Sequence, residues 1–323
     1  MDNLTHSLVG AVLGQMGLKR KSGLAMPTLI IAANLPDIDA GCALYGIESL
    51  AMRRGITHGP IALLVLPLIL WGAMIAFDRW QTRRGTRPAG RLPVDKGWLL
   101  ALAYIGCLSH PALDWLNNYG IRLLEPFSSR WFYGDTLFII DLWIWAMLGV
   151  SLWLSIRREK VGSPRWTTPA RAGFAAVLGY IVVNGLISHA AERTTVEALR
   201  ATGKKDVLAV ASPPPLFFWR RDIFWRAGGR FGSGEFVPGV GGSLDISGAP
   251  TGTEDEQAKA RWAKADPAAR AFLFWARMPI VERDADGARW LRDQRYNSPF
   301  ARERFQVPLP ATQGSGTESS RGG

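Results

Sequence analysis

The sequence contains few of the residues that hold small extracellular domains or cysteine-based zinc modules together. Only two of its 323 residues are cysteines, Cys42 and Cys107, which can form at most one disulfide and lack the spacing of paired metal ligands. The opening residues, MDNLTHSLVG, lack the basic stretch that begins a cleavable signal peptide, so we expect none. Histidine is also scarce, with four in the chain. A disulfide framework is therefore excluded, and the position of each histidine becomes informative.

Long stretches without charge are present instead. Residues 60–77 contain no charged side chain, and residues 97–109, 142–156 and 172–188 are similarly free of charge. An α-helix needs about 20 residues to cross the hydrocarbon layer of a membrane. Four such runs in one chain favour a membrane protein over a soluble protein with a buried helix.

The basic residues behind the net charge of +11 gather in the connections between these runs. Residues 19–21, 78–96 and 157–171 contain fourteen lysines and arginines, whereas the alternate connections, 35–57 and 114–136, contain four. This alternation is the positive-inside signature of membrane proteins, and it places the three basic connections in the cytoplasm. The excess positive charge thus orients the chain in a membrane, and we expect no nucleic-acid partner.

The expected fold is an all-α polytopic membrane helical bundle followed by a small α+β extracytoplasmic domain. The bundle, residues 1–190, is expected to have about six helical segments, the first two short, at 5–17, 24–34, 58–77, 97–113, 136–156 and 171–190. We expect the second domain over residues 191–309. The Gly/Ser/Thr-rich composition of residues 310–323 predicts a disordered tail.

Three patterns support the α+β interpretation of the second domain. Residues 213–237 indicate two strands around a Gly-rich turn. Residues 256–278 indicate helix, with Pro267 starting a second one, and residues 287–296 indicate another strand. The aromatic stretch 217–225 is typical of membrane-surface docking or of a two-sided strand in a small core.

Ionisable side chains collect at the outer end of the predicted bundle. On the expected topology they are His6, Asp37, Asp39, His58, His110, Asp114, Asp141, His189 and Glu192. Ionisable groups at a membrane boundary cost free energy and are usually functional. In SHPALDWLNNYG, His110 and Asp114 are one helical turn apart and share a face, unless Pro111 breaks the helix. Imidazole and carboxylate together suit Zn²⁺ and similar ions.

Structural interpretations compete with metal binding at several of these positions. Asp37 and Asp39 can cap a helix and a turn. The pair of His110 and Asp114 can form a structural hydrogen bond. A single interfacial histidine such as His189 is more often hydrogen-bonded than bound to a metal.

Neighbouring polar residues allow further roles. Arg53 and Arg54 can bind a substrate phosphate or face lipid headgroups, and Asn117 and Asn118 can donate hydrogen bonds behind the ligands or cap a helix. Asp141 lies inside the apolar stretch TLFIIDLWIW, which favours a role in the site over a cap. All five residues are therefore candidates for the functional site.

The chain resembles the membrane-bound metal-dependent hydrolases of the YdjM/YbcI type, also described as LexA-regulated inner-membrane proteins. The resemblance covers about residues 1–190 and rests on five stretches in order: MDNLTHSLVG, NLPDID, RRGITHGP, SHPALDWLNNYG and LEPFSSRWFYGDTLFIID. This family is grouped with zinc-dependent phospholipase C and P1 nuclease-like enzymes, in which clustered His and Asp side chains hold two or three zinc ions. The resemblance implies a metal-binding set of His6, Asp37, Asp39, His58, His110, Asp114 and Asp141. Pro111 and Leu142 depart from the family pattern.

The resulting hypothesis is a multi-pass hydrolase of the bacterial inner membrane, with its second domain in the periplasm. It would use two or more divalent ions, with Zn²⁺ expected, held by His6, Asp37, Asp39, His58, His110 and Asp114. His189 and Glu192 are candidate additional ligands, and Asp39 or Asp141 is the candidate general base. The expected substrate is a phospholipid or lipid-linked phosphate. A metal transporter and a non-catalytic scaffold are the alternatives, and the oligomeric state stays open.

Overall fold

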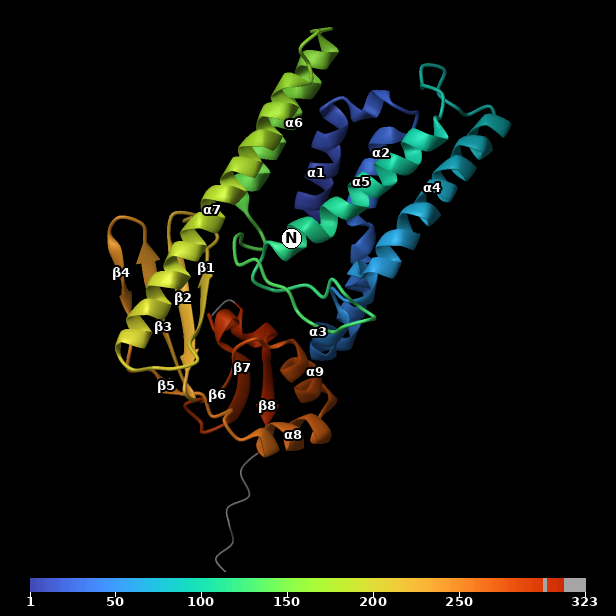
Figure 1. The fold of residues 1–323 in the computed structure, drawn as a ribbon. Coiled ribbons are helices and arrows are strands. Elements are labelled where there is room, and N and C mark those ends of the chain that lie inside the picture. The colour runs from blue at the N-terminus through green and yellow to red at the C-terminus, as the bar shows by residue number, and fades with distance from the viewer. Residues whose placement is uncertain (299–300, 311–323) are drawn as a thin grey trace, which may run out of the picture.

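The computed structural model describes residues 1–298 and 301–310, and the chain forms a helical half followed by a half built on two sheets (Figure 1). The predicted disordered tail, except for residue 310, lies outside the described residues. The helical half contains α1 (Asn3–Gln15), η1 (Leu18–Arg20), α2 (Ala25–Asn34), η2 (Leu35–Glu48), α3 (Ser49–Met52), η3 (Ile56–His58), α4 (Pro60–Arg83), α5 (Lys96–Trp115), α6 (Leu142–Lys160) and α7 (Thr168–Ala201), where η marks a 3₁₀ helix.

The sheet-containing half begins after α7. It contains β1 (Leu208–Ser212), β2 (Arg221–Ala227), β3 (Arg230–Val237), β4 (Gly241–Leu244), β5 (Ala249–Pro250), α8 (Glu256–Ala265), α9 (Pro267–Trp275), β6 (Pro279–Arg283), β7 (Arg289–Asp293), η4 (Gln294–Tyr296), η5 (Arg302–Arg304) and β8 (Gln306–Leu309). One antiparallel sheet has the order β1-β2-β3-β4, with β5 paired to β3, and the other has the order β6-β7-β8. The predicted start of a second helix at Pro267 is confirmed.

The hairpin of β2 and β3 shows how the predicted Gly-rich turn works. Ala227 pairs with Arg230, so the turn has two residues, Gly228 and Gly229. Both have positive φ angles, 55° and 73°, which L side chains rarely adopt. Because tight two-residue turns of this kind need such angles, glycine fits both positions. The two strands predicted for residues 213–237 are confirmed.

The expected six-segment membrane bundle is wrong. Among the described residues, only α4 and α7 are long and apolar enough to cross a membrane. With 13 and 10 residues, α1 and α2 are too short for a membrane crossing. Polar site residues interrupt the last turns of α5, and charged residues 157–160 end α6. Uncharged runs thus predicted the helices correctly but overstated how many cross a membrane.

Close helix packing in the helical half depends on two glycines. A Cβ atom at Gly10 of α1 would lie 2.7 Å from the carbonyl oxygen of Leu29 in α2. A Cβ atom at Gly106 of α5 would lie 2.9 Å from the same oxygen. Only glycine lets both helices approach α2 this closely, because any side chain would collide with its backbone. This packing brings α1 and α5 together against α2 at the Leu29 carbonyl.

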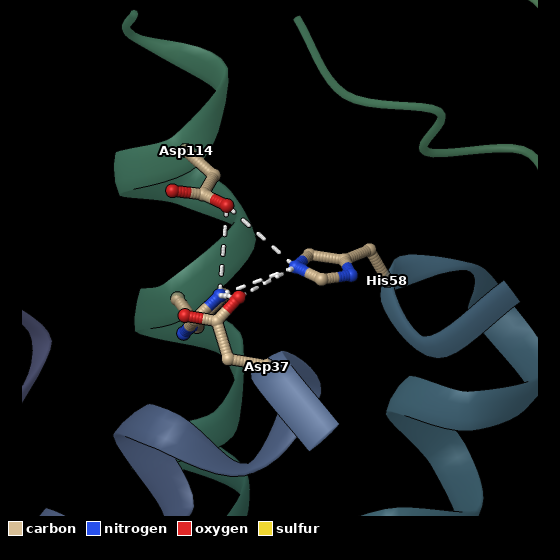
Figure 2. Close-up of side chains that lie close together, drawn as sticks. Asp37, His58 and Asp114 are labelled. Atoms are coloured by element: carbon tan, nitrogen blue, oxygen red, sulfur yellow. Dashed lines mark hydrogen bonds and ion pairs between the residues drawn. The ribbon is translucent and has the colours of Figure 1, made fainter. Parts of the chain in front are cut away.

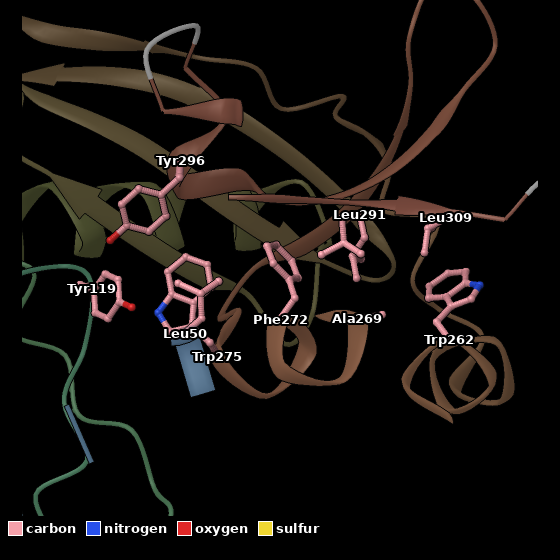
Figure 3. Close-up of a cluster of buried hydrophobic side chains, with 10 residues drawn as sticks. Leu50, Tyr119, Trp262, Ala269, Phe272, Trp275, Leu291, Tyr296 and Leu309 are labelled. Atoms are coloured by element: carbon pink, nitrogen blue, oxygen red, sulfur yellow. The ribbon is translucent and has the colours of Figure 1, made fainter. Parts of the chain in front are cut away.

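The two halves share one hydrophobic core (Figure 3). Phe272, Trp275 and Leu291 form its centre in the sheet-containing half. Leu50 of α3 and Tyr119, which follows α5, complete it from the helical half. The segments that leave α3 and α5 are therefore held in place by residues more than a hundred positions away.

Candidate metal centre

Four buried side chains from three segments converge in the helical half. Asp37 comes from η2, His58 from η3, and His110 and Asp114 from α5. One potential ligand atom of each lies within 4.8 Å of one such atom in every other. Figure 2 shows Asp37, His58 and Asp114 pointing toward one another from separate segments. We call these four residues the quartet.

The helix α5 supplies two members of the quartet because it runs through Pro111 without a break. His110 and Asp114 therefore remain one turn apart on the same face. Nε2 of His110 lies 3.5 Å from Oδ2 of Asp114. Ser109 does not cap a new helix, since its hydroxyl donates to the Gly106 carbonyl within α5. The proline thus leaves the predicted spacing of the pair intact.

The hydrogen bonds made by the Nδ1 atoms of His58 and His110 fix how the two rings face the centre of the quartet. Nδ1 of His110 lies 2.7 Å from the carbonyl oxygen of Ala33, which can only accept, so Nδ1 carries the proton. The hydroxyl of Thr57 donates to Asp39 and lies 2.9 Å from Nδ1 of His58, so it accepts from that nitrogen. In each neutral ring, Nε2 then presents a lone pair toward the centre.

These two lone pairs face each other. The Nε2 atoms of His58 and His110 are 3.2 Å apart. Oδ1 of Asp37 lies 3.6 Å from Nε2 of His110, and Oδ2 of Asp114 lies 3.6 Å from Nε2 of His58. Two neutral imidazoles and two carboxylates with no cation between them repel one another. A divalent ion among these atoms would remove that repulsion, because imidazole nitrogen and carboxylate oxygen are zinc ligands.

Buried polar atoms without hydrogen-bond partners support the same interpretation. They include Oδ2 of Asp114, Oδ1 of Asp39 and both ring nitrogens of His6. An unsatisfied buried polar group costs about 1–3 kcal/mol, so such groups are rare in folded proteins. Several of them beside one cluster indicate a site that is completed by a bound group. The donor set fits the divalent metal that the sequence predicts.

The electrostatics of the quartet also suit a metal. Burial alone would raise the pKa of Asp37, but favourable interactions with His110, His58 and Arg54 outweigh it and bring the pKa to about 2. Burial, with repulsion from His110 and Arg54, lowers the pKa of His58 well below its ordinary value. At neutral pH the carboxylate is ionised and the imidazole is neutral, which are the forms that coordinate metals.

His6 lies directly against the quartet. Its ring stacks on that of His110 with centroids 3.7 Å apart, and its Nε2 lies 3.4 Å from Oδ1 of Asp114. The glycine contacts with α2 explain this placement, since His6 is one turn before Gly10 and His110 is one turn after Gly106. The amino group of Met1 also contacts Asp114.

Asp39 is buried behind His58 rather than within the quartet. Its Oδ2 accepts hydrogen bonds from the backbone N–H of Arg54, at 2.7 Å, and from the Thr57 hydroxyl, at 2.9 Å. The same oxygen lies 3.5 Å from Nδ1 of His58. This geometry fixes the orientation of the His58 ring. Thr57 was not among the site residues predicted from the sequence, although its position directly before His58 in ITHGP could have indicated a supporting role.

Arg54 places a buried positive charge beside the quartet. Its Nε lies 3.0 Å from Oδ2 of Asp114, and its Nη1 donates to Oδ1 of Asn117 at 2.9 Å. The guanidinium also lies over the ring of Tyr119, 4.7 Å from its centroid. Arg53, its neighbour, is only partly buried. Of the two arginines predicted for phosphate binding, Arg54 is therefore the one that reaches the site.

Four of the site residues predicted from the sequence lie outside the quartet. Asp141 caps α6 by accepting from the backbone N–H groups of residues 143 and 144, and it also accepts from a tyrosine hydroxyl of α7. His189 is exposed on α7. Glu192 accepts from the Ala211 N–H of β1, at 3.2 Å. Asn118 donates to Ser212 and so faces the sheet-containing half.

A protein-family comparison places this site in a known context. Residues 1–191, more than half of the chain, match the model of the YdjM inner membrane protein family. The matched region contains the whole quartet together with His6, Asp39 and Arg54. No curated protein and no solved structure matches the chain. By its first 191 residues, the chain belongs to the YdjM inner membrane protein family.

Proposed function

We propose that the chain is an integral membrane, metal-dependent hydrolase that cleaves a phosphoester of a lipid or another amphiphilic molecule. The observation that carries the proposal is the pair of Nε2 atoms 3.2 Å apart, flanked by two buried carboxylates. A neutral cluster of hydrogen-bonded side chains would not need two lone pairs to face each other. A cluster that binds a cation does need lone pairs that converge on one point.

The quartet would hold one ion, with Zn²⁺ as the best fit to two imidazoles and two carboxylates. His6, whose ring nitrogens have no hydrogen-bond partner, and Oδ1 of Asp114, which also contacts the Met1 amino group, would offer ligand atoms for a second ion next to it. A bound ion of this kind supplies a Lewis acid that activates water and stabilises negative charge on a phosphoryl group. Asp114 is shared by both positions, so it is the residue on which a two-ion arrangement depends.

The surrounding residues prepare the site for an anionic substrate. Asp39 and Thr57 hold the His58 ring so that its Nε2 faces the centre. Arg54 offers a guanidinium that is already oriented by Asp114 and Asn117. A fixed positive charge in a buried site attracts a phosphate oxygen more strongly than an exposed one, because little water screens it.

The proposed orientation puts the site and the sheets outside the cytoplasm. In Figure 1, the α4–α5 and α6–α7 connections lie at the end of the helices that points away from the sheets. Each adjoins one of the two candidate spans and is rich in basic residues, so the positive-inside rule assigns both to the cytoplasm. With α4 and α7 crossing the membrane, the quartet lies near the outer end of α4, next to the lipid headgroups.

Metal analysis tests the proposed centre. The purified protein should contain at least one zinc ion per chain, and His110→Ala should lose it. His189→Ala is the matched control, because it removes a histidine that is exposed on α7. Wild-type protein without stoichiometric metal would contradict the proposal, as would equal metal loss in both variants.

Hydrolysis requires its own measurement. Vesicles of phosphatidylethanolamine and phosphatidylglycerol, and the soluble diester bis(4-nitrophenyl) phosphate, serve as probes. Release of phosphate-containing headgroup or of nitrophenol should depend on metal and disappear in His110→Ala. Stoichiometric metal without hydrolysis of either probe would favour the transport or scaffold alternative.

Cysteine labelling tests the orientation. In a Cys42→Ser background, a membrane-impermeant maleimide should label Ala285→Cys from the outside. It should label Gly90→Cys, in the α4–α5 connection, only after lysis. Both positions are exposed, so accessibility depends on the side of the membrane. Labelling of position 90 in unlysed cells would overturn the orientation.

A further inference from the structure

The chain between the quartet members Asp37 and His58 exposes an unusual number of large apolar side chains. Leu44 is 93% exposed, and Ile56 is 69% exposed. We call the full set the apolar rim: Ile38, Leu44, Tyr45, Met52 and Ile56. Single exposed apolar residues are ordinary on protein surfaces, but a group of them in one short segment marks an interaction surface.

The apolar rim is adjacent to the candidate metal centre in the chain. Ile38 lies between Asp37 and Asp39, and its side chain is 58% exposed while both aspartates are buried. Ile56 lies two residues before His58, which is fully buried. At both places the backbone directs a polar side chain into the protein and an apolar one outward. The outer surface next to the quartet is therefore apolar.

The apolar rim also adjoins a helix that is long and apolar enough to cross a membrane. The segments η2 and η3 both pack against α4. Only 17% of the apolar window of α4 is buried, and its first turns expose Ile61, Leu64 and Leu68. The apolar rim thus continues a surface that a membrane-spanning α4 would turn toward lipid.

Charge and shape favour lipid as the occupant of this surface. Residues 40–47 contain no charged side chain, and Tyr45 adds an aromatic ring with a polar tip, a residue type enriched at membrane–water boundaries. A cavity of about 310 Å³ lies between α3 and α9, beside the apolar rim. Its lining includes Ala51, Met52, Ala271 and Phe274, with Glu48 and Arg270 as the charged residues.

We propose that the apolar rim is immersed in the headgroup–acyl boundary of the outer leaflet and admits substrate to the quartet sideways from the bilayer. The immersion follows from the continuity of the apolar rim with α4. Substrate entry rests, in addition, on the proposed function. The acyl chains of a lipid then lie along Ile38 and Ile56 while its headgroup reaches the buried metal ligands.

Nitroxide labelling in proteoliposomes tests the immersion. Leu44→Cys in a Cys42→Ser background gives a labelling site at the most exposed rim residue, and Cys107 is fully buried and can stay. The label should be relaxed more strongly by oxygen than by a water-soluble nickel chelate. A label at Ala285→Cys, exposed in the turn between β6 and β7, is the control and should show the reverse preference.

Two results would overturn the immersion. One is a label at position 44 with the same preference for the nickel chelate as the control. The other is strong spin–spin broadening at position 44, which disappears when labelled chains are diluted with unlabelled ones. The second result would assign the apolar rim to a contact between two copies of the chain.

A kinetic comparison tests sideways entry. Leu44→Asn should lower activity on phospholipid vesicles relative to activity on the soluble diester by roughly fivefold, the factor that corresponds to ~1 kcal/mol of lost apolar burial. An unchanged ratio would contradict entry from the bilayer. If wild-type protein hydrolyses neither probe, the proposed function and sideways entry fail together, while the label at position 44 still decides the immersion independently.

Discussion

Two buried polar clusters in this molecule are built in opposite ways. In the sheet-containing half, Asp293 and Arg295 satisfy each other: the carboxylate accepts from the Arg295 guanidinium and backbone and from the Met278 N–H. Nη1 of Arg295 donates to the Asn118 carbonyl. In the helical half, by contrast, two histidine nitrogens face each other, and Oδ2 of Asp114 forms an ion pair with Arg54 but accepts no hydrogen bond.

The difference separates a structural cluster from a candidate ligand site. Where every donor has an acceptor, the charges are neutralised within the chain and the cluster holds segments together. At the quartet, Arg54 and the Met1 amino group contact Asp114, but the two facing Nε2 atoms have no donor between them. Both clusters are buried and both contain aspartate, so hydrogen-bond satisfaction is the property on which we compare them.

The largest expected effect comes from breaking the satisfied pair. Arg295→Met should lower the free energy of unfolding of the sheet-containing half by ~3–5 kcal/mol, because Asp293 would remain buried without its partner. Arg283→Met, which removes an exposed arginine of β6, should change it by less than about 0.5 kcal/mol. Denaturant unfolding followed by tryptophan fluorescence measures both. Equal effects would remove the distinction between the two clusters.

The pair of Asp293 and Arg295 also makes the stability of the fold depend on pH. Burial alone would raise the pKa of Asp293, but Arg295 and the hydrogen bonds to the carboxylate hold it below its usual value of 3.8. The ionised carboxylate therefore stabilises the fold above pH 3.8, and this contribution is lost as the pH falls through the lower folded-state pKa. Asp293→Asn should be less stable at pH 7 and should lose less stability than wild type on acidification. Thermal unfolding between pH 7 and pH 2 gives the two slopes, and parallel slopes would refute the assignment.

A smaller effect is expected from disturbing the support of one candidate ligand. Thr57→Val keeps the side-chain shape but removes the hydroxyl between His58 and Asp39, so zinc affinity should fall about 10–100-fold. Thr28→Val is the matched control, because it removes a hydroxyl that donates to the Leu24 carbonyl within the helical half, away from His58. Competition with a chromogenic chelator measures the affinities. A similar fall in both variants would show that the hydroxyl has no special role at His58.

The smallest effect is expected at Asp141, where the structure distinguishes a helix cap from a metal ligand. Asp141→Ala should cost ~1 kcal/mol of stability, the usual effect of losing a helix N-cap. Metal content should stay unchanged, because Asp141 caps α6 and is not part of the quartet. Thermal unfolding and elemental analysis on the same sample give both quantities. Loss of zinc from this variant would return Asp141 to the candidate ligands, as the sequence predicted.

Sequence pattern was informative wherever the signal was local. The one-turn spacing of His110 and Asp114 predicted a shared face, and the structure places both in the quartet. The same reasoning could not separate Asp37 from Asp39, because residues two apart in a 3₁₀ segment point in directions that only packing decides. It also could not show that Asp141 caps a helix, since a cap and a ligand at the start of a helix have the same residue type.

Features that depend on distant contacts were not predictable from the sequence. Uncharged length marks a helix but does not show whether lipid or protein surrounds it. The expected bundle of about six helical segments, the first two short, therefore contains only two candidate spans among the described residues. Likewise, no local pattern links Leu50 or Tyr119 to Trp275, yet all three share one core. The support of the candidate site by the second half of the chain is therefore a result of the structure alone.

This shared core has a consequence for how the protein can be shortened. The family match ends at residue 191, which makes residues 1–191 the obvious fragment to express. Such a fragment would leave Leu50 and Tyr119 without the aromatic residues that cover them, at the two places where the chain leaves the ligand-bearing segments. The end of the family match is thus not a point at which the chain can be cut without exposing this core, because residues beyond the match cover the segments that carry the candidate ligands.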